Sequence, residues 1–284
     1  MVYDKPYLSI REQVELLQAR GLVIDNVIEA EQVLQQINYY RFAAFALPFQ
    51  SQKDTFDHGT TLQHILSVYS FDTRLRSLIL TALEKVEIQL KTLVALYLGE
   101  TYGPFGYADK NNFGNKVKQS DWLQKTQKEI NRSRETFVGH FKSKYPKSPN
   151  LPIWMLTEVM SLGSLSFLVN YLSYKDQKNI SKKMGIKKGI AVSWLHHLTY
   201  VRNLCAHHSR LWNRIFAIRP MLPHNIGWGI TPDKADNIFC TLKIIQNLSD
   251  QFALDVDVIK TTKTLIKSHS TVPLDLKKIM GFNE

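Results

Sequence analysis

Residues 202–214, RNLCAHHSRLWNR, combine three arginines, two asparagines and two adjacent histidines. Cleavage of RNA without a metal needs a base for the 2′-hydroxyl proton, an acid for the leaving 5′-oxygen and positive charge at the phosphate. Histidine titrates near neutrality and serves in either proton transfer, arginine presents donors that fit phosphate oxygens, and asparagine can orient either group. This segment is therefore a candidate site for RNA cleavage.

A helical wheel separates the side chains of this segment, because each residue of an α-helix turns the chain by about 100 degrees. The inward set lies within roughly 60 degrees of Val201. It consists of Trp194, Leu198, Val201, Cys205, His208 and Trp212. Asn203 and His207 lie about 40 degrees apart on the opposite side, with Arg202 at the edge of that face. We therefore expect His208 to be a buried, hydrogen-bonded residue and His207 to be the outward, functional one.

The outward face supplies one histidine at its centre, whereas the reaction is most readily served by two proton-transfer groups. A second copy of the chain could supply the other across a two-fold axis, so we expect a homodimer with a shared cleft. No metal is expected, because His196 and His207 are about 16 Å apart along one helix and no acidic or cysteine partner falls at ligand spacing. No cofactor is expected either.

The rest of the chain predicts the helices that must position this segment. Apolar residues recur at helical spacing from Thr61 to Gly99, which predicts one very long helix or two joined near Phe71 and Asp72. Ser9 and Glu12 have the spacing of a capping box at the start of a first helix. No strand alternation is found, so the fold class is all-α. The expected parts are a helical N-terminal module (1–55), a helical bundle (60–250) and a C-terminal tail with a short helix (251–284).

The composition bounds the partners and the compartment. The 284 residues include 36 lysines and arginines against 25 acidic residues, a net charge of +11 that favours a polyanionic partner such as nucleic acid. Cys205 and Cys240 are the only cysteines, so a disulfide framework and a four-cysteine zinc site are excluded. The sequence predicts no membrane span and no export signal, and we expect a cytoplasmic protein.

Two further patterns have a structural and a functional interpretation. The segment KKMGIKKG, residues 182–189, is typical of a solvated turn, although it could also lie along an RNA backbone. The aromatic cluster of Tyr39, Tyr40, Phe42 and Phe45 could stack bases, but its helical spacing favours core packing.

At residues 202–207 the sequence resembles the HEPN superfamily, whose ribonuclease members carry an R-x4-6-H motif, often with a polar residue directly after the arginine. Here Arg202, Asn203 and His207 match those three positions. The chain as a whole is similar to the Abi-like (AbiD/AbiF) bacterial abortive-infection family, from about Lys5 to Arg214. The similar stretches, in family order, are INYYRFAAFALPF, YSFDTRLRSLILTALEKVEIQLKT, LPIWMLTEVMSLGSLSFL and RNLCAHHSRLWNR.

The resemblance implies an α-helical HEPN-type bundle, a role in defence against phage and RNA cleavage at a dimer interface. In that interpretation His207 is the acid or base, Arg202 holds the phosphate in the transition state and Asn203 is the orienting residue. The candidate RNA-binding residues are Arg210, Asn213 and Arg214. A cognate small RNA or a small protein would fit as a regulator.

Three alternatives stay open. Some HEPN proteins bind RNA or partner proteins without cleaving RNA, and this chain could be such a non-catalytic binding module. A DNA-binding regulator that uses the N-terminal helices is weaker, because no helix-turn-helix signature with a basic second helix is found. Arg134 and His140 also have the R-x4-6-H spacing, but Gly139 and the nearby Tyr145 and Pro146 predict a helix end there, which favours a surface histidine near a helix terminus.

Overall fold

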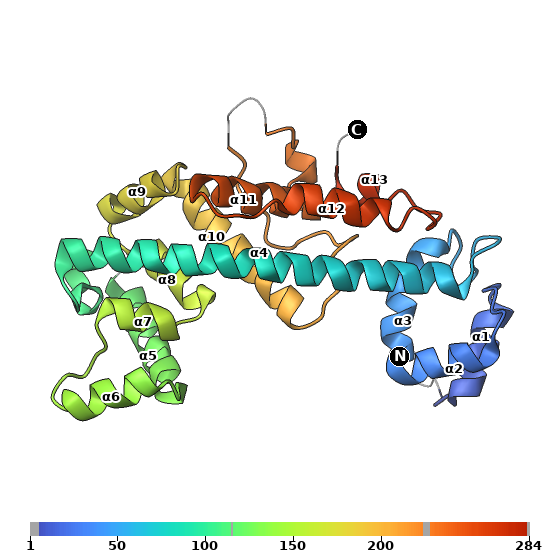
Figure 1. Ribbon diagram of the computed structural model, residues 1–284, viewed down its shortest axis with the longest axis horizontal. Coiled ribbons are helices and arrows are strands. Elements are labelled where there is room, and N and C mark those ends of the chain that lie inside the picture. The colour runs from blue at the N-terminus through green and yellow to red at the C-terminus, as the bar shows by residue number, and fades with distance from the viewer. Residues whose placement is uncertain (1–5, 115, 224–227, 283–284) are drawn as a thin grey trace. The chain divides into compact units, whose positions relative to one another are not determined.

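The computed structural model describes residues 6–114, 116–223 and 228–282. Over these residues the regular structure is helical, with a few isolated β-bridges and no strand (Figure 1). The prediction of an all-α fold is confirmed.

The regular structure of the described residues consists of thirteen α-helices and four short 3-10 helices. Their bounds are α1 (Ile10–Ala19), α2 (Val27–Gln36), α3 (Tyr39–Ala46), η1 (Leu47–Phe49), α4 (Leu62–Tyr102), η2 (Gly106–Ala108), η3 (Lys110–Asn112), α5 (Lys116–Arg132), α6 (Thr136–Lys144), α7 (Ile153–Val159), α8 (Leu162–Tyr171), α9 (Tyr174–Lys183), α10 (Lys188–Ala206), η4 (Pro232–Lys234), α11 (Ile238–Gln251), α12 (Val258–Lys267) and α13 (Leu276–Met280).

Internal contacts divide the chain into two compact units. One unit contains the described residues up to Arg74 together with Lys263–Asp275, and the other contains Leu75–Thr262 and the residues from Leu276 onward. All the candidate residues of the segment 202–214 belong to the second, larger unit.

The smaller unit begins with the predicted capping box. The Ser9 hydroxyl accepts a hydrogen bond from the Glu12 amide, and the Glu12 carboxylate accepts one from the Ser9 amide. Helix α1 then packs against α2. Of the aromatic cluster, Phe42 and Phe45 are buried as predicted, whereas Tyr40 is 86% exposed.

Helix α4 is one continuous helix of 41 residues without a break at Phe71 and Asp72, which decides between the two predicted possibilities. In the larger unit it buries an apolar stripe that includes Leu75, Ile79 and Leu90. Glu87 and Lys91, four residues apart on α4, form an ion pair at 3.0 Å, with both side chains largely buried. This pair lies near the candidate site, as described below.

Three helices of the larger unit hold α10 in place. Helix α10 packs against α8 and α9, and α8 packs against α5. Gly163 permits the close approach of α8 to α10, because a Cβ at that position would lie 3.4 Å from a methyl carbon of Thr199. The indole N–H of Trp122 on α5 donates to the carbonyl oxygen of Ser164 at 2.7 Å. The helix that carries the candidate residues is therefore supported along its length.

A buried carboxylate joins the end of α4 to the start of α9. Asp176 accepts hydrogen bonds from the hydroxyls of Tyr97 at 2.6 Å, Tyr102 at 3.0 Å and Ser173 at 2.5 Å. Burial, and then the neighbouring carboxylate, raise the pKa of Tyr102 to about 12, so its hydroxyl stays a donor. A buried charge is tolerated when it is hydrogen-bonded in this way, and this one fixes the position of α9.

Candidate functional site

The candidate residues lie at the carboxyl end of α10. The side chains of Arg202 and Asn203 are exposed in its last turn, and His207 is the exposed residue that caps the helix. The inward stripe predicted for the helical part is confirmed, since Trp194, Leu198, Val201 and Cys205 are all buried. The wheel therefore gave the correct facing direction for the residues that it placed up to His207.

The prediction for His208 is wrong, because the helix ends before it. His208 has φ of 55° and is exposed, and its amide donates to the carbonyl oxygen of Cys205 at 3.0 Å. The amide of Ser209 donates to the carbonyl oxygen of Leu204 at 2.9 Å. These bonds form a Schellman motif with a left-handed residue after the cap. Trp212 is buried as expected, but it lies in the segment that follows α10.

The three candidate RNA-binding residues follow the helix end and do not extend the polar face of α10. Arg210, Asn213 and Arg214 are half-buried. The Arg214 Nε donates to the carbonyl oxygen of Arg210 at 2.8 Å, which holds part of this guanidinium against the backbone. The Asn213 Oδ1 is buried and has no hydrogen-bond partner among the described residues.

Arg202 and Asn203 line a surface hollow of about 320 Å³. Lys125 on α5 adds a second cation to its wall, and His196 and Thr199 add polar groups from α10. None of the lining residues is acidic. The hollow therefore presents arginine, lysine and asparagine donors of the kind that bind phosphate oxygens. His207 lies one helical turn beyond Asn203 and is outside the lining residues.

Arg202 also lines a second hollow, of about 420 Å³, against α4. Glu84, Glu87 and Lys91 contribute to this wall, so Arg202 lies between a hollow of mixed charge and the basic one described above. Neither the proximity of Glu84 and Glu87 to Arg202 nor that of Lys125 was predicted, since nothing in the local sequence links α4 or α5 to the motif.

His197 takes the structural role that the sequence had given to His208. Its ring is buried, with Nδ1 at 2.6 Å from the carbonyl oxygen of Ile218 and Nε2 at 2.8 Å from the hydroxyl of Thr241. A carbonyl oxygen only accepts, so Nδ1 carries the proton and Nε2 accepts from Thr241. Burial lowers the pKa of His197 to about 4, which keeps the ring neutral. The wheel could have found it, because His197 lies about 40 degrees from Val201.

Arg134 and His140, the rival motif with the same R-x4-6-H spacing, lie in a different kind of local structure. Arg134 lies in the short link before α6, and His140 is an exposed residue inside that helix, which runs on to Lys144. The helix continues through Gly139 and ends at Lys144, directly before Tyr145 and Pro146, which were part of the expected end. Arg134 and His140 do not share one helix, unlike Arg202 and Asn203.

Among the residues that the structure describes, no group of three or more histidine, cysteine or acidic side chains is placed to hold a metal ion. No described helix has the length and apolar character needed to cross a membrane.

A family model for Abi-like proteins matches residues 32–213, well over half of the sequence. The chain belongs to the Abi-like protein family. The matched region of this Abi-like protein includes Arg202, Asn203 and His207 and ends at Asn213. Membership indicates a role in abortive-infection defence. No curated protein and no solved structure matches the chain significantly.

Proposed function

We propose that this Abi-like protein is a metal-independent endoribonuclease of the HEPN type that acts in abortive infection. The observation that carries the proposal is the exposure of Arg202, Asn203 and His207 together at the carboxyl end of α10. The first two line a hollow that contains Lys125 and no carboxylate, which suits the phosphate of an RNA strand.

In the proposed reaction the 2′-oxygen of the RNA attacks the adjacent phosphorus and the bond from phosphorus to the 5′-oxygen breaks. One imidazole takes the 2′-hydroxyl proton and a protonated one gives a proton to the leaving 5′-oxygen. His207 is the acid or base, Arg202 stabilises the charge that develops on the phosphate, and Asn203 orients the imidazole or the phosphate. The products are a 2′,3′-cyclic phosphate and a 5′-hydroxyl.

The proposal includes a homodimer, because a single chain presents one His207 and two such groups serve both proton transfers. Two exposed apolar side chains on α4 are available for an association near the site. Ile88 lines the hollow that Arg202 shares with α4 and is 57% exposed, and Leu96 is 67% exposed on the same helix. A two-fold interface that covered them would bury this apolar area. RNA is the proposed substrate, and a cognate small RNA or protein is the proposed regulator.

The test is cleavage of total bacterial RNA by purified protein in the presence of a chelator, with His140→Ala as the matched control. Both histidines are exposed, and His140 belongs to the rival motif. We expect His207→Ala to lower the cleavage rate by ~10²–10⁴-fold, the usual contribution of a positioned proton-transfer group. His140→Ala should cleave as wild type does. Equal cleavage by His207→Ala and wild type would overturn the proposal.

A second candidate function is RNA or partner binding without cleavage. The position of His207 beyond the hollow lined by Arg202 and Asn203 favours it, because one chain alone does not enclose a pair of proton-transfer groups. This alternative predicts salt-dependent RNA binding by wild type, and no cleavage products from wild type or from His207→Ala under any condition.

A further inference from the structure

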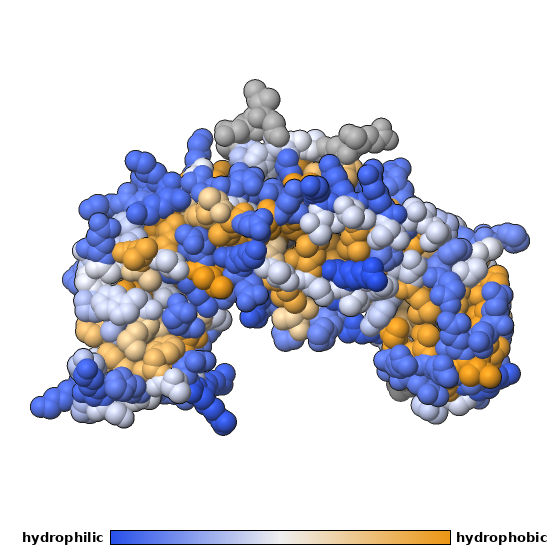
Figure 2. All heavy atoms as spheres, in the orientation of Figure 1, coloured by the Kyte–Doolittle hydropathy of each residue, from blue (hydrophilic) through white to orange (hydrophobic). Residues whose placement is uncertain are grey.

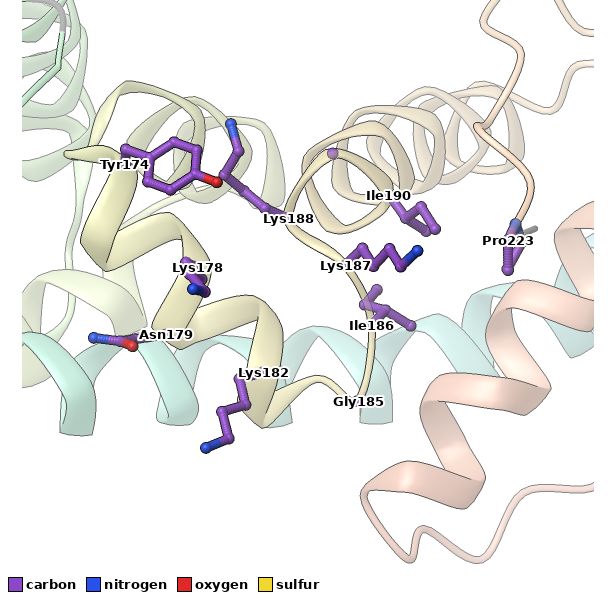
Figure 3. Close-up of a pocket in the computed structure, with 11 residues that line it drawn as sticks. Tyr174, Lys178, Asn179, Lys182, Gly185, Ile186, Lys187, Lys188, Ile190 and Pro223 are labelled. Carbon is purple, nitrogen blue, oxygen red and sulfur yellow. The ribbon is translucent and has the colours of Figure 1, made fainter. Parts of the chain in front are cut away.

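A basic groove of about 1030 Å³ lies where the chain passes from α9 into α10. Lys178 and Lys182 border it from α9, and Lys187 and Lys188 border it from the turn and the first residue of α10 (Figure 3). In the space-filling view the surface over α9 is predominantly hydrophilic (Figure 2). The turn belongs to segment 182–189, which the sequence analysis singled out. Lys178, which lies outside that segment, adds a further lysine to the groove.

The backbone brings these lysines together through Gly185. This residue has φ of 69° and follows the last turn of α9, with its amide bonded to the carbonyl oxygen of Lys182 at 3.1 Å. The amide of Ile186 donates to the carbonyl oxygen of Ser181 at 3.1 Å, which completes a Schellman motif. The positive φ at this position favours glycine. The turn brings the lysines on its two sides to one groove.

The groove carries positive charge without an acidic counterpart in its wall. Lys178, Lys182 and Lys187 are exposed, and no aspartate or glutamate lines the groove. The nearby Asp176 is buried under its tyrosine and serine partners. The amino end of the 19-residue helix α10 adds further positive potential to the same place. An anion bound here would meet several cations at once.

The shape and the apolar part of the wall favour a polymer over a single small anion. The volume is at the upper end of the range for small-molecule pockets, and the lysines border it from two helices. Ile186 and Ile190 supply apolar surface, and Tyr174 is 69% exposed at the rim, with the Lys188 ammonium 4.7 Å from its ring centre. Cationic side chains beside an aromatic ring are typical of surfaces that bind single-stranded nucleic acid.

We propose that this groove binds the phosphate backbone of the RNA strand on which the protein acts. The inference rests on the proposed function for the choice of RNA, and it adds a binding surface separate from Arg202 and His207. Lys188 and Arg202 lie about 21 Å apart along α10 and about 40 degrees apart around it. Leu195, midway between them on this side of α10, is buried, so an RNA strand that reaches both places passes over the helices packed against α10. In this proposal the groove sets affinity and position while the far end of α10 does the chemistry.

The test compares two triple variants that remove the same charge. Lys178→Gln, Lys182→Gln and Lys187→Gln together alter the groove, and Lys142→Gln, Lys144→Gln and Lys147→Gln together alter an exposed control cluster in and after α6. Both are made in a His207→Ala background, so that the RNA stays intact during the measurement. The probe is a labelled 20-nucleotide oligouridylate, titrated with protein at several salt concentrations.

We expect the groove variant to bind the probe at least about tenfold more weakly than the control variant at low salt. The slope of log affinity against log salt should fall in magnitude by about 2, since each lost contact to a single strand removes about 0.7. Equal affinity and equal slope for the two variants would overturn the proposal. So would full competition by millimolar inorganic phosphate, or lysine-dependent binding to phosphatidylserine vesicles without binding to the probe.

Failure of this proposal and failure of the proposed function give different results. If the groove variant loses affinity while His207→Ala leaves cleavage unchanged, the groove binds RNA and the assignment of the reaction is wrong. If His207→Ala abolishes cleavage while both triple variants bind alike, the reaction stands and the groove has no part in it. When the three groove substitutions are made in the protein that retains His207, RNA cleavage should show a raised KM with kcat nearly unchanged. An unchanged melting temperature shows that the substitutions leave the fold intact.

Discussion

The backbone amide of His207 donates a hydrogen bond to the carbonyl oxygen of Asn203 at 2.9 Å. Residues four apart at such a bond lie one helical turn from each other on the same side of the helix. The two side chains therefore leave the end of α10 as neighbours, and both are exposed. This placement suits the role proposed for Asn203, which is to orient the imidazole.

The effects of substitutions at Asn203 and His207 on RNA cleavage should not multiply. Asn203→Ala should slow single-turnover cleavage by about tenfold, less than the loss of a proton-transfer group, because an orienting residue acts through the imidazole. In the absence of that imidazole, Asn203→Ala should change the residual rate little. The measurement is a double-mutant cycle on kcat. A double variant whose loss equals the product of the two single losses would contradict a shared role.

His208 should tolerate glycine better than a β-branched residue, because its φ of 55° lies in the left-handed region. Glycine adopts this conformation freely, whereas a side chain there costs about 1–2 kcal/mol. We expect His208→Val to lower the free energy of unfolding by about that amount relative to His208→Gly, measured by urea denaturation. Equal midpoints for the two variants would show that the helix does not end at this residue in solution.

The buried ring of His197 should make the stability of the protein fall in mild acid. Burial lowers its pKa to about 4 in the folded chain, from 6.5 when unfolded, so the unfolded chain takes up a proton first as the pH drops. The stabilising contribution is complete above pH 6.5 and is lost progressively down to about pH 4, by about 3 kcal/mol in total. Unfolding curves across this range test it.

The comparison for His197 is the His197→Asn variant, which carries a polar side chain that does not titrate. Carboxylates elsewhere contribute to acid unfolding in both proteins, so the difference between the two curves isolates the histidine. Wild type should lose stability more steeply than His197→Asn between pH 6.5 and 4. Parallel curves would mean that the ring is protonated in the folded protein.

Both cysteines should resist alkylation in the folded protein. Cys205 and Cys240 are buried, and burial raises the pKa of Cys240 to about 12, so little reactive thiolate is present at pH 8. We expect no mass increase with iodoacetamide under native conditions and two additions after unfolding in guanidinium. Labelling of the native protein at the rate of a free thiol would contradict the packing of α10 and α11.

Periodicity made the helical part of the candidate site predictable. The spacing of Trp194, Leu198, Val201 and Cys205 fixed the inward face of α10, and the outward position of Asn203 followed from it. The capping box at Ser9 and the helical character of residues 62–102 were predictable for the same kind of local reason, although the sequence left open whether α4 was one helix or two. Each of these features depends on residues within a few turns of one another.

The end of α10 was not predictable, because no glycine or proline marks it and a histidine takes the left-handed position. The wheel placed His208 and Trp212 on a continuing helix, and their facing directions depended on that continuation. Contacts between distant segments were also beyond reach. Arg202 shares one hollow with Lys125 and another with Glu84 and Glu87, and only the packing of separate helices brings these residues close to it. The lysines of the groove lie close together because the chain turns at Gly185.

Because of the way α10 ends, the side chains of its last turn are not needed to hydrogen-bond the backbone carbonyl oxygens there. The carbonyl oxygens of Asn203, Leu204 and Cys205 are each taken by a backbone amide from residues 207–209. Side chains at many helix ends are needed to satisfy such groups. The side chains at positions 203 and 207 can therefore be replaced without leaving a carbonyl oxygen unbonded. Homologous proteins could thus differ between RNA cleavage and RNA binding at this helix end while keeping the same backbone.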